Sequence, residues 1–136
     1  MELNAWLIDT SAINRLPESP HSKLWIERLE QGQVHISAIT RLEIGYSARS
    51  FKDLEDTFSS PPISMMPIQG LTPAIEELAW QTLRLLAKKG QHRAPSIPDL
   101  LISATAKLTG MKVLHNDKDF ELIAKVTGQS VEKLKL

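Results

Sequence analysis

The chain has 136 residues, of which 42% are hydrophobic and 24% charged. This is the length and balance of one ordinary globular domain with a buried core, so disorder is excluded. Sixteen basic and sixteen acidic side chains cancel, which excludes a chain-wide positive field for holding nucleic acid. The absence of cysteine excludes a disulfide scaffold and a thiolate zinc site. We expect a single domain over residues 1–136.

Neither a targeting segment nor a membrane span is predicted. The first residues, Met1 to Asn4, lack the basic region and the small-residue cleavage site of a signal peptide. No apolar run approaches the roughly 18 residues that are needed to cross a bilayer. We therefore expect a cytoplasmic protein with no membrane partner.

The first half of the chain predicts short strands followed by helical stretches. In chain order these are a buried strand over 5–8, a helix from an N-cap at Ser22 to a stop at Gly32, a strand over 34–36, a helix that Ser37 caps and that runs to about Arg49, a helical stretch before Pro61, and an extended run over 63–68.

The second half contains the clearest helix, over residues 72–89. Thr72 fits the N-cap, Pro73 the first helical position and Gly90 the stop. Further along we expect a helix over 98–109, a strand over 112–115 and a helix over 118–126. Strands separated by helices indicate an α/β fold, with a small, mostly parallel β-sheet flanked by helices in an α/β/α sandwich.

Acidic residues occur at four places in this otherwise apolar pattern. Asp9 and Asp117 each follow a predicted strand, where parallel sheets place their ligand sites. Asp99 opens a helix that is apolar almost all round, and Glu43 lies beside an apolar stripe of its own helix. Four carboxylates at close range could not all stay ionised without a cation. Oxygen ligands suit Mg²⁺ or Mn²⁺, and the natural chemistry is metal-assisted cleavage of a phosphodiester.

Each acid also has a structural explanation. Asp9 and Asp117 could cap the helices that follow them. Asp99 fits a capping box with Ser96, with aspartate in place of the preferred glutamate. Glu43 could form a salt bridge with an arginine near it in the sequence. Taken together, however, the acids form a pattern that a shared edge of the sheet could collect.

A basic stretch lies just before Asp99. Its cations Lys88, Lys89 and Arg93 could hold phosphates of RNA near the acids. Cations are also favoured at a helix C-terminus, where they face the negative end of the dipole, and this explanation stays open. The four histidines show no zinc spacing, and a Gly-rich phosphate loop is absent.

Four motifs in this order resemble the PIN-domain family, and more narrowly the VapC-type toxins of toxin–antitoxin pairs. The motifs are Ile8-Asp9-Thr10-Ser11-Ala12, Arg41-Leu42-Glu43, Pro98-Asp99-Leu100-Leu101-Ile102 with Ala104, and Asn116-Asp117-Lys118-Asp119-Phe120. The resemblance covers nearly the whole chain. It implies a ribonuclease with Mg²⁺ or Mn²⁺ in an acidic pocket, which pairs as a homodimer and is neutralised by a cognate VapB-like antitoxin.

The resemblance also implies site residues. The catalytic and metal-binding quartet matches Asp9, Glu43, Asp99 and Asp117. The supporting positions beside the first and last acids are Thr10, Ser11, Asn116 and Asp119. We expect Asp9 and Asp99 to bind the metal directly. The other two members of the quartet would complete the shell, directly or through water.

Other functions remain open at this point. The chain could be a PIN-domain nuclease that is not a toxin, or a catalytically idle RNA-binding or interaction module. A metal-dependent phosphatase would also place an aspartate at a strand end, but its Asp-x-Asp pair is missing because Ser11 stands two residues after Asp9. An idle RNA-binding module would not need four acids and would favour a more basic chain. A structural domain would use each acid as a helix cap.

Overall fold

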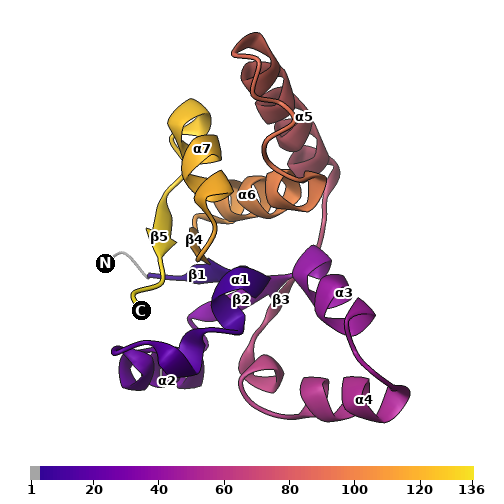
Figure 1. Ribbon diagram of the computed structural model, residues 1–136, viewed down its shortest axis with the longest axis vertical. Helices are drawn as coiled ribbons and strands as arrows, with labels where there is room; N and C mark the ends of the chain where they lie inside the picture. Colours follow the sequence, from indigo (N-terminus) through magenta and orange to yellow (C-terminus); the bar gives the residue numbers. More distant parts are fainter. Residues whose placement is uncertain (1–3) are drawn as a thin grey trace.

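Five short strands form one parallel sheet in the computed structural model, which describes residues 4–136 (Figure 1). The strands are β1 (Trp6–Ile8), β2 (Val34–Ser37), β3 (Ile68–Gln69), β4 (Lys112–His115) and β5 (Val131–Lys133). Their order across the sheet is β3-β2-β1-β4-β5, and every neighbouring pair is parallel. The predicted α/β fold with a parallel sheet is confirmed.

Helices cover both faces of this sheet. They are α1 (Thr10–Ile13), α2 (Ser22–Glu30), α3 (Ala38–Tyr46), α4 (Phe51–Ser59), α5 (Pro73–Lys88), α6 (Ile97–Thr109) and α7 (Lys118–Thr127), with 3₁₀ turns η1 (Leu16–Glu18) and η2 (Ile63–Met65). Helices α5, α6 and α7 lie on one side, and α2 and α4 on the other (Figure 1). Within residues 4–136, no helix is long and apolar enough to span a membrane.

Two hydrophobic clusters pack on opposite faces of the sheet because side chains alternate along a strand. On β1, Trp6 and Ile8 belong to the cluster beneath α1 and α2, whereas Leu7 belongs to the cluster beneath α5, α6 and α7. The guanidinium of Arg28 lies 4.2 Å from the ring centroid of Trp6 and 4.4 Å from that of Trp25, so it covers the edge of the first cluster. Burial on both faces explains why these strands read as continuous apolar runs.

Capping side chains set several helix starts that the sequence predicted. The hydroxyls of Ser37 and Thr72 each accept a hydrogen bond from a backbone N–H three residues further on. At the start of α6, Ser96 Oγ accepts the N–H of Asp99 at 3.2 Å, and Asp99 Oδ2 accepts the N–H of Ser96 at 3.4 Å. The predicted capping box is therefore confirmed.

Two predicted helix boundaries are wrong. Ser22 is not an N-cap but the first residue of α2, and the cap position is held by His21, whose side chain makes no capping hydrogen bond. Helix α3 ends at Tyr46 instead of near Arg49. The chain turns before that point because the Ser50 side chain caps the next helix, α4.

Two further segments differ from the prediction. The run over 63–68 was expected to be extended, but Ile63–Met65 is a 3₁₀ turn and only Ile68 at its end enters β3. Ile63 is buried in the cluster beneath α2, so packing favours the turn. Strand β5 was not predicted, because its three residues include two charged ones and give no apolar run. It nevertheless pairs with β4 along the whole of its length.

Candidate active site

The carboxyl ends of β1 and β4 bring the first and last acidic motifs together. The two strands are parallel neighbours, with Ile8 paired to Leu114. The N–H of Asp9 donates to the carbonyl of Leu114 at 2.9 Å, so Asp9 leaves the sheet beside the end of β4. Asp117 follows β4 at the same edge, as expected for functional residues in a parallel sheet.

Helix α6 delivers a third carboxylate to this edge. It packs against β1, β4 and α3, and Asp99 lies in its first turn with only 8% of its surface exposed. One carboxylate oxygen from each of Asp99, Asp117 and Asp119 lies within 4.8 Å of the other two. These three residues are called the aspartate trio below. Asp119 enters it because Asp117 Oδ1 accepts the N–H of Asp119 at 3.0 Å, at the start of α7.

Asp9 and Glu43 are not members of the trio. Together with burial, the negative charge of Asp9 nevertheless affects the pKa of Asp99 in the trio and that of Glu43. Burial, followed by the negative charge of Asp9, raises the pKa of Asp99 to about 6; Asp117 also raises it, and hydrogen bonds with Ser96 oppose the shift. Burial and then the charge of Asp9 raise the pKa of Glu43 as well. The structure thus gathers all four predicted acids into one electrostatically coupled region.

Ser11 links the first acidic motif to the last. Its N–H donates to Asp9 Oδ2 at 3.1 Å, and its Oγ accepts the N–H of Asn116 at 2.9 Å. The neighbouring Thr10 has a buried Oγ1 that finds no hydrogen-bond partner within residues 4–136. A buried hydroxyl without a partner, next to an acidic cluster, fits a site that binds a further polar group.

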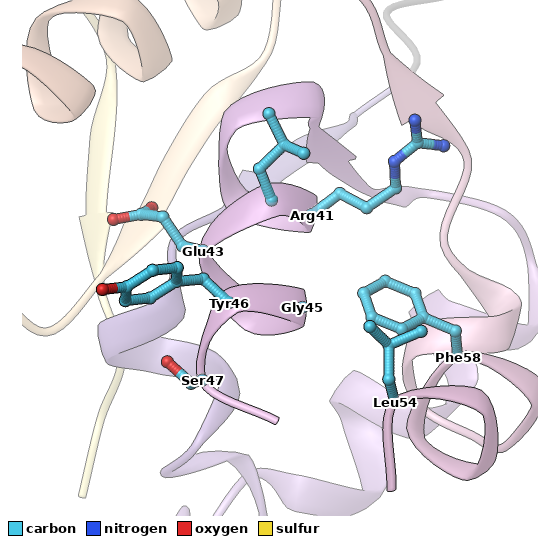
Figure 2. A pocket seen from close by; sticks show the side chains of 8 residues that line it. Arg41, Glu43, Gly45, Tyr46, Ser47, Leu54 and Phe58 are labelled. Carbon is cyan, nitrogen blue, oxygen red and sulfur yellow. The ribbon is translucent and has the colours of Figure 1, made fainter. Parts of the chain in front are cut away.

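Among residues 4–136, no lysine, arginine or histidine side chain forms an ion pair with Asp9, Glu43 or the aspartate trio. Arg41 and Glu43 point to opposite sides of α3 (Figure 2), and Arg49 pairs with Asp53 instead. The alternative of a salt bridge for Glu43 is therefore wrong. Unpaired carboxylates at this spacing fit Mg²⁺ or Mn²⁺, which favour oxygen ligands.

The capping explanation and the metal explanation are compatible. Asp9, Asp99 and Asp117 do cap or box helices α1, α6 and α7. Each of these contacts uses one carboxylate oxygen, namely Oδ2 of Asp9, Oδ2 of Asp99 and Oδ1 of Asp117. The second oxygen of each group is left for another ligand. Helix N-termini also favour the negative charges that a metal site needs.

A groove of about 820 Å³ adjoins Glu43 between α3 and α4 (Figure 2). It passes over Gly45, where a Cβ would lie 3.7 Å from Leu54 and 3.9 Å from Phe58. Tyr46 is 92% exposed and points to the same side of α3 as Glu43 (Figure 2). An exposed aromatic ring therefore stands directly beside one of the acids. The sequence prediction did not include Tyr46, although its place three residues after Glu43 implied a shared helix face.

The basic residues Lys88, Lys89 and Arg93 are not brought into the acidic cluster. Lys88 ends α5 and Lys89 is its C-cap. This end of α5 projects away from the sheet, and the following loop returns from it to α6 (Figure 1). All three side chains are exposed, and the two lysines occupy the helix end where cations are favoured.

The sequence matches a known protein family. The profile of the PIN domain matches residues 6–126, which is most of the chain. The chain therefore belongs to the PIN domain family, and the predicted resemblance is confirmed.

Individual relatives agree with this assignment. Ribonuclease VapC2 of Mycobacterium tuberculosis (strain CDC 1551 / Oshkosh) is 54% identical over 129 residues, which cover 95% of this chain and 92% of that protein. Ribonuclease VapC51 of M. tuberculosis (strain ATCC 25618 / H37Rv) is 42% identical over 125 residues, or 91% of this chain and 88% of that protein.

Solved structures show the same fold. DNA-bound VapBC from Salmonella typhimurium matches with a TM-score of 0.78 at 20% identity, over 96% of this chain and 98% of that one. FitAcB from Neisseria gonorrhoeae matches with a TM-score of 0.69, also at 20% identity, over 93% of this chain and 95% of that one.

The raised pKa of Asp99 predicts a pH-dependent stability change. Its ordinary pKa of 3.8 rises to about 6 in the fold, so ionisation costs stability as the pH rises through this interval. Asp99→Asn removes that cost, and its amide oxygen can still accept the N–H of Ser96. In EDTA at pH 8, we expect the variant to exceed the wild type in free energy of unfolding by at most about 3 kcal/mol.

Urea unfolding at a series of pH values measures this difference. It should shrink toward zero as the pH falls below about 3, where Asp99 is protonated in both the folded and the unfolded state. A destabilised variant at pH 8, or a difference independent of pH, would show that burial and the neighbouring acids do not disfavour the ionised form of Asp99. Asp56→Asn, on the exposed surface of α4, is the matched control.

Proposed function

We propose that this chain is a metal-dependent endoribonuclease, the toxin component of a VapBC-type toxin–antitoxin module. The observation that carries the proposal is the aspartate trio, with carboxylate oxygens within 4.8 Å of one another and no cation from the described residues to balance them. Membership of the PIN domain family and the 54% identity to Ribonuclease VapC2 support ribonuclease activity.

The aspartate trio would hold Mg²⁺ or Mn²⁺, with Asp9 and Glu43 beside it. When bound, such a metal supplies a Lewis acid that polarises a phosphate oxygen and makes water a better nucleophile at neutral pH. Asp99, Asp117 and Asp119 are proposed as direct ligands because each offers a carboxylate oxygen within 4.8 Å of the other two, and the expectation that Asp9 also binds the metal directly stays a prediction.

Side chains around the trio have separate tasks. The carboxylate of Glu43 is suited to take the proton from the attacking water, because its raised pKa increases its basicity toward the range useful near neutral pH. Ser11 keeps Asp9 and the Asn116 turn in fixed register through its two hydrogen bonds. The ring of Tyr46 beside Glu43 suits stacking of an unpaired base, which favours single-stranded RNA.

Contacts of RNA with Lys88, Lys89 and Arg93 remain part of the proposal. Because these cations lie at the outer end of α5 and in the loop that returns from it, they would meet phosphates remote from the cleaved one. They would position the strand without reading its sequence.

Two observations support a protein partner, namely the solved complexes that share this fold and an apolar hollow on the surface. Structures of VapBC complexes share this fold, and we propose a VapB-like antitoxin and a homodimer for this chain. A separate hollow of about 880 Å³ lies between α1, α2, α4 and η2, with Ile13, Trp25, Ile26 and Ile63 among its lining residues. Apolar hollows of this size on a surface mark binding sites.

Neutralising one member of the trio should stop RNA cleavage. We expect Asp99→Asn and Asp117→Asn each to reduce Mn²⁺-dependent cleavage of single-stranded RNA by at least about 100-fold, because each removes a metal ligand. EDTA should abolish the wild-type activity. Asp56→Asn is the control, and circular dichroism checks the fold of every variant. Near wild-type cleavage by a folded trio variant would contradict the assignment.

Expression of the chain alone should arrest bacterial growth. The expected cause is RNA cleavage, so Asp99→Asn should be harmless at equal protein level. Co-expression of the neighbouring antitoxin gene should restore growth by covering the toxin. The measurement is colony count with and without induction. Unimpaired growth with folded, abundant wild-type protein would contradict the toxin role while leaving ribonuclease activity to be judged by the cleavage assay.

A further inference from the structure

His115, the last residue of β4, is completely buried and lies two residues before Asp117. Its Nδ1 accepts the N–H of Asp117 at 3.1 Å, and its Nε2 lies 3.2 Å from Oε1 of Glu121. Its ring packs against Phe120, with ring centroids 5.4 Å apart. Its backbone carbonyl accepts the N–H of Leu134, directly after β5, at 2.7 Å. His115 thus contacts the sheet edge at β5, helix α7 and the turn that joins β4 to α7.

These contacts determine where the proton of the neutral ring lies. A backbone N–H can only donate, so Nδ1 must carry the lone pair that faces Asp117, and the ring proton is on Nε2. Nε2–H then donates to the carboxylate of Glu121. With both nitrogens engaged and no exposed surface, His115 has no free atom for substrate, water or metal. It is therefore not a catalytic residue.

Asp117 is placed between two fixed points. On one side its N–H is bound through His115 to the end of β4. On the other side its Oδ1 accepts the N–H of Asp119 in the first turn of α7, the same turn that carries Glu121. The direction of the Asp117 side chain therefore depends on the spacing between β4 and α7, which the imidazole of His115 sets.

We propose that His115, held by Glu121, is a positioning residue that sets the Asp117 and Asp119 carboxylates at the spacing required for a divalent metal. This inference rests on the metal site in the proposed function. Outer groups that orient metal ligands commonly contribute 10- to 100-fold to metal affinity or activity. The contribution here comes from a backbone hydrogen bond to the ligand residue rather than from contact with the metal.

Replacements of His115 separate its two hydrogen bonds. Asparagine can place Oδ1 close to the position of Nδ1 and accept the N–H of Asp117, but it is too short to reach Glu121. Phenylalanine keeps the ring and its contact with Phe120, but leaves the N–H of Asp117 without an acceptor. At the other end, Glu121→Gln keeps an acceptor oxygen, whereas Glu121→Ala removes it.

Isothermal titration of the full chain with Mn²⁺ at pH 7.5, without RNA, tests the proposal. We expect His115→Phe to weaken Mn²⁺ binding by about 10-fold or more. His115→Asn should recover most of this loss. Glu121→Ala should weaken binding by about 3-fold, the value of one ordinary hydrogen bond, and Glu121→Gln should bind nearly as well as the wild type.

The control is His35→Phe on β2. His35 has its own hydrogen bond, from the side-chain amide of Gln69 at 2.9 Å, but contacts none of the acids through a hydrogen bond in the described chain. This variant should keep wild-type Mn²⁺ affinity. Thermal unfolding of each variant separates a local loss of metal binding from a loss of the fold.

Unchanged Mn²⁺ affinity in a folded His115→Phe variant would overturn the inference. If the His115→Phe variant does not fold, the two variants of the exposed Glu121 test the inference instead. Equal Mn²⁺ affinities of Glu121→Ala and the wild type would then overturn it. A wild-type chain that binds no Mn²⁺ would overturn the proposed metal site together with this inference. Wild-type binding with unaffected variants would overturn the inference alone.

Discussion

Repulsion between carboxylates at one edge of a parallel sheet is the constraint on which this site depends. Carboxylate oxygens of the aspartate trio lie within 4.8 Å of one another, and burial, followed by the negative charge of Asp9, raises the pKa of Asp99. The fold tolerates this arrangement because Asp9, Asp99 and Asp117 also bind backbone N–H groups at helix starts, where negative charge is stabilised. A divalent cation would relieve the part of the carboxylate repulsion that the helix termini do not offset.

The sheet makes this crowding possible because it leaves the acids little freedom to separate. Asp9 is bound to the end of β4 through Leu114, and Ser11 binds the N–H of Asn116 across the same gap. Behind them, His115 is clamped by β5 and α7. Buried, hydrogen-bonded side chains of this kind fix the direction of a neighbouring ligand. A site that must accept a metal without rearrangement requires such a frame.

The sequence predicted the fold and the four acids because both depend on local signals. Short apolar runs just before Asp9 and shortly before Asp117 indicate buried strands, and Ser96 with Asp99 indicates a helix start. The entry of Asp119 into the trio depends on the geometry of one turn, and the role of His115 on a partner six residues away. Such contacts leave no periodic pattern. Strand β5 was missed for a related reason, since its stability comes from pairing with β4 and not from its own composition.

The most direct test of the account is the position of a bound metal. Crystals of the wild-type chain soaked in Mn²⁺ should give an anomalous-difference peak between the carboxylates of Asp99, Asp117 and Asp119, at ordinary metal–oxygen distances of roughly 2.1 Å. Crystals of Asp99→Asn soaked in the same way should give a much weaker peak or none. A strong peak elsewhere, or no peak in the wild type at saturating Mn²⁺, would contradict the claim that these acids are gathered to hold a cation.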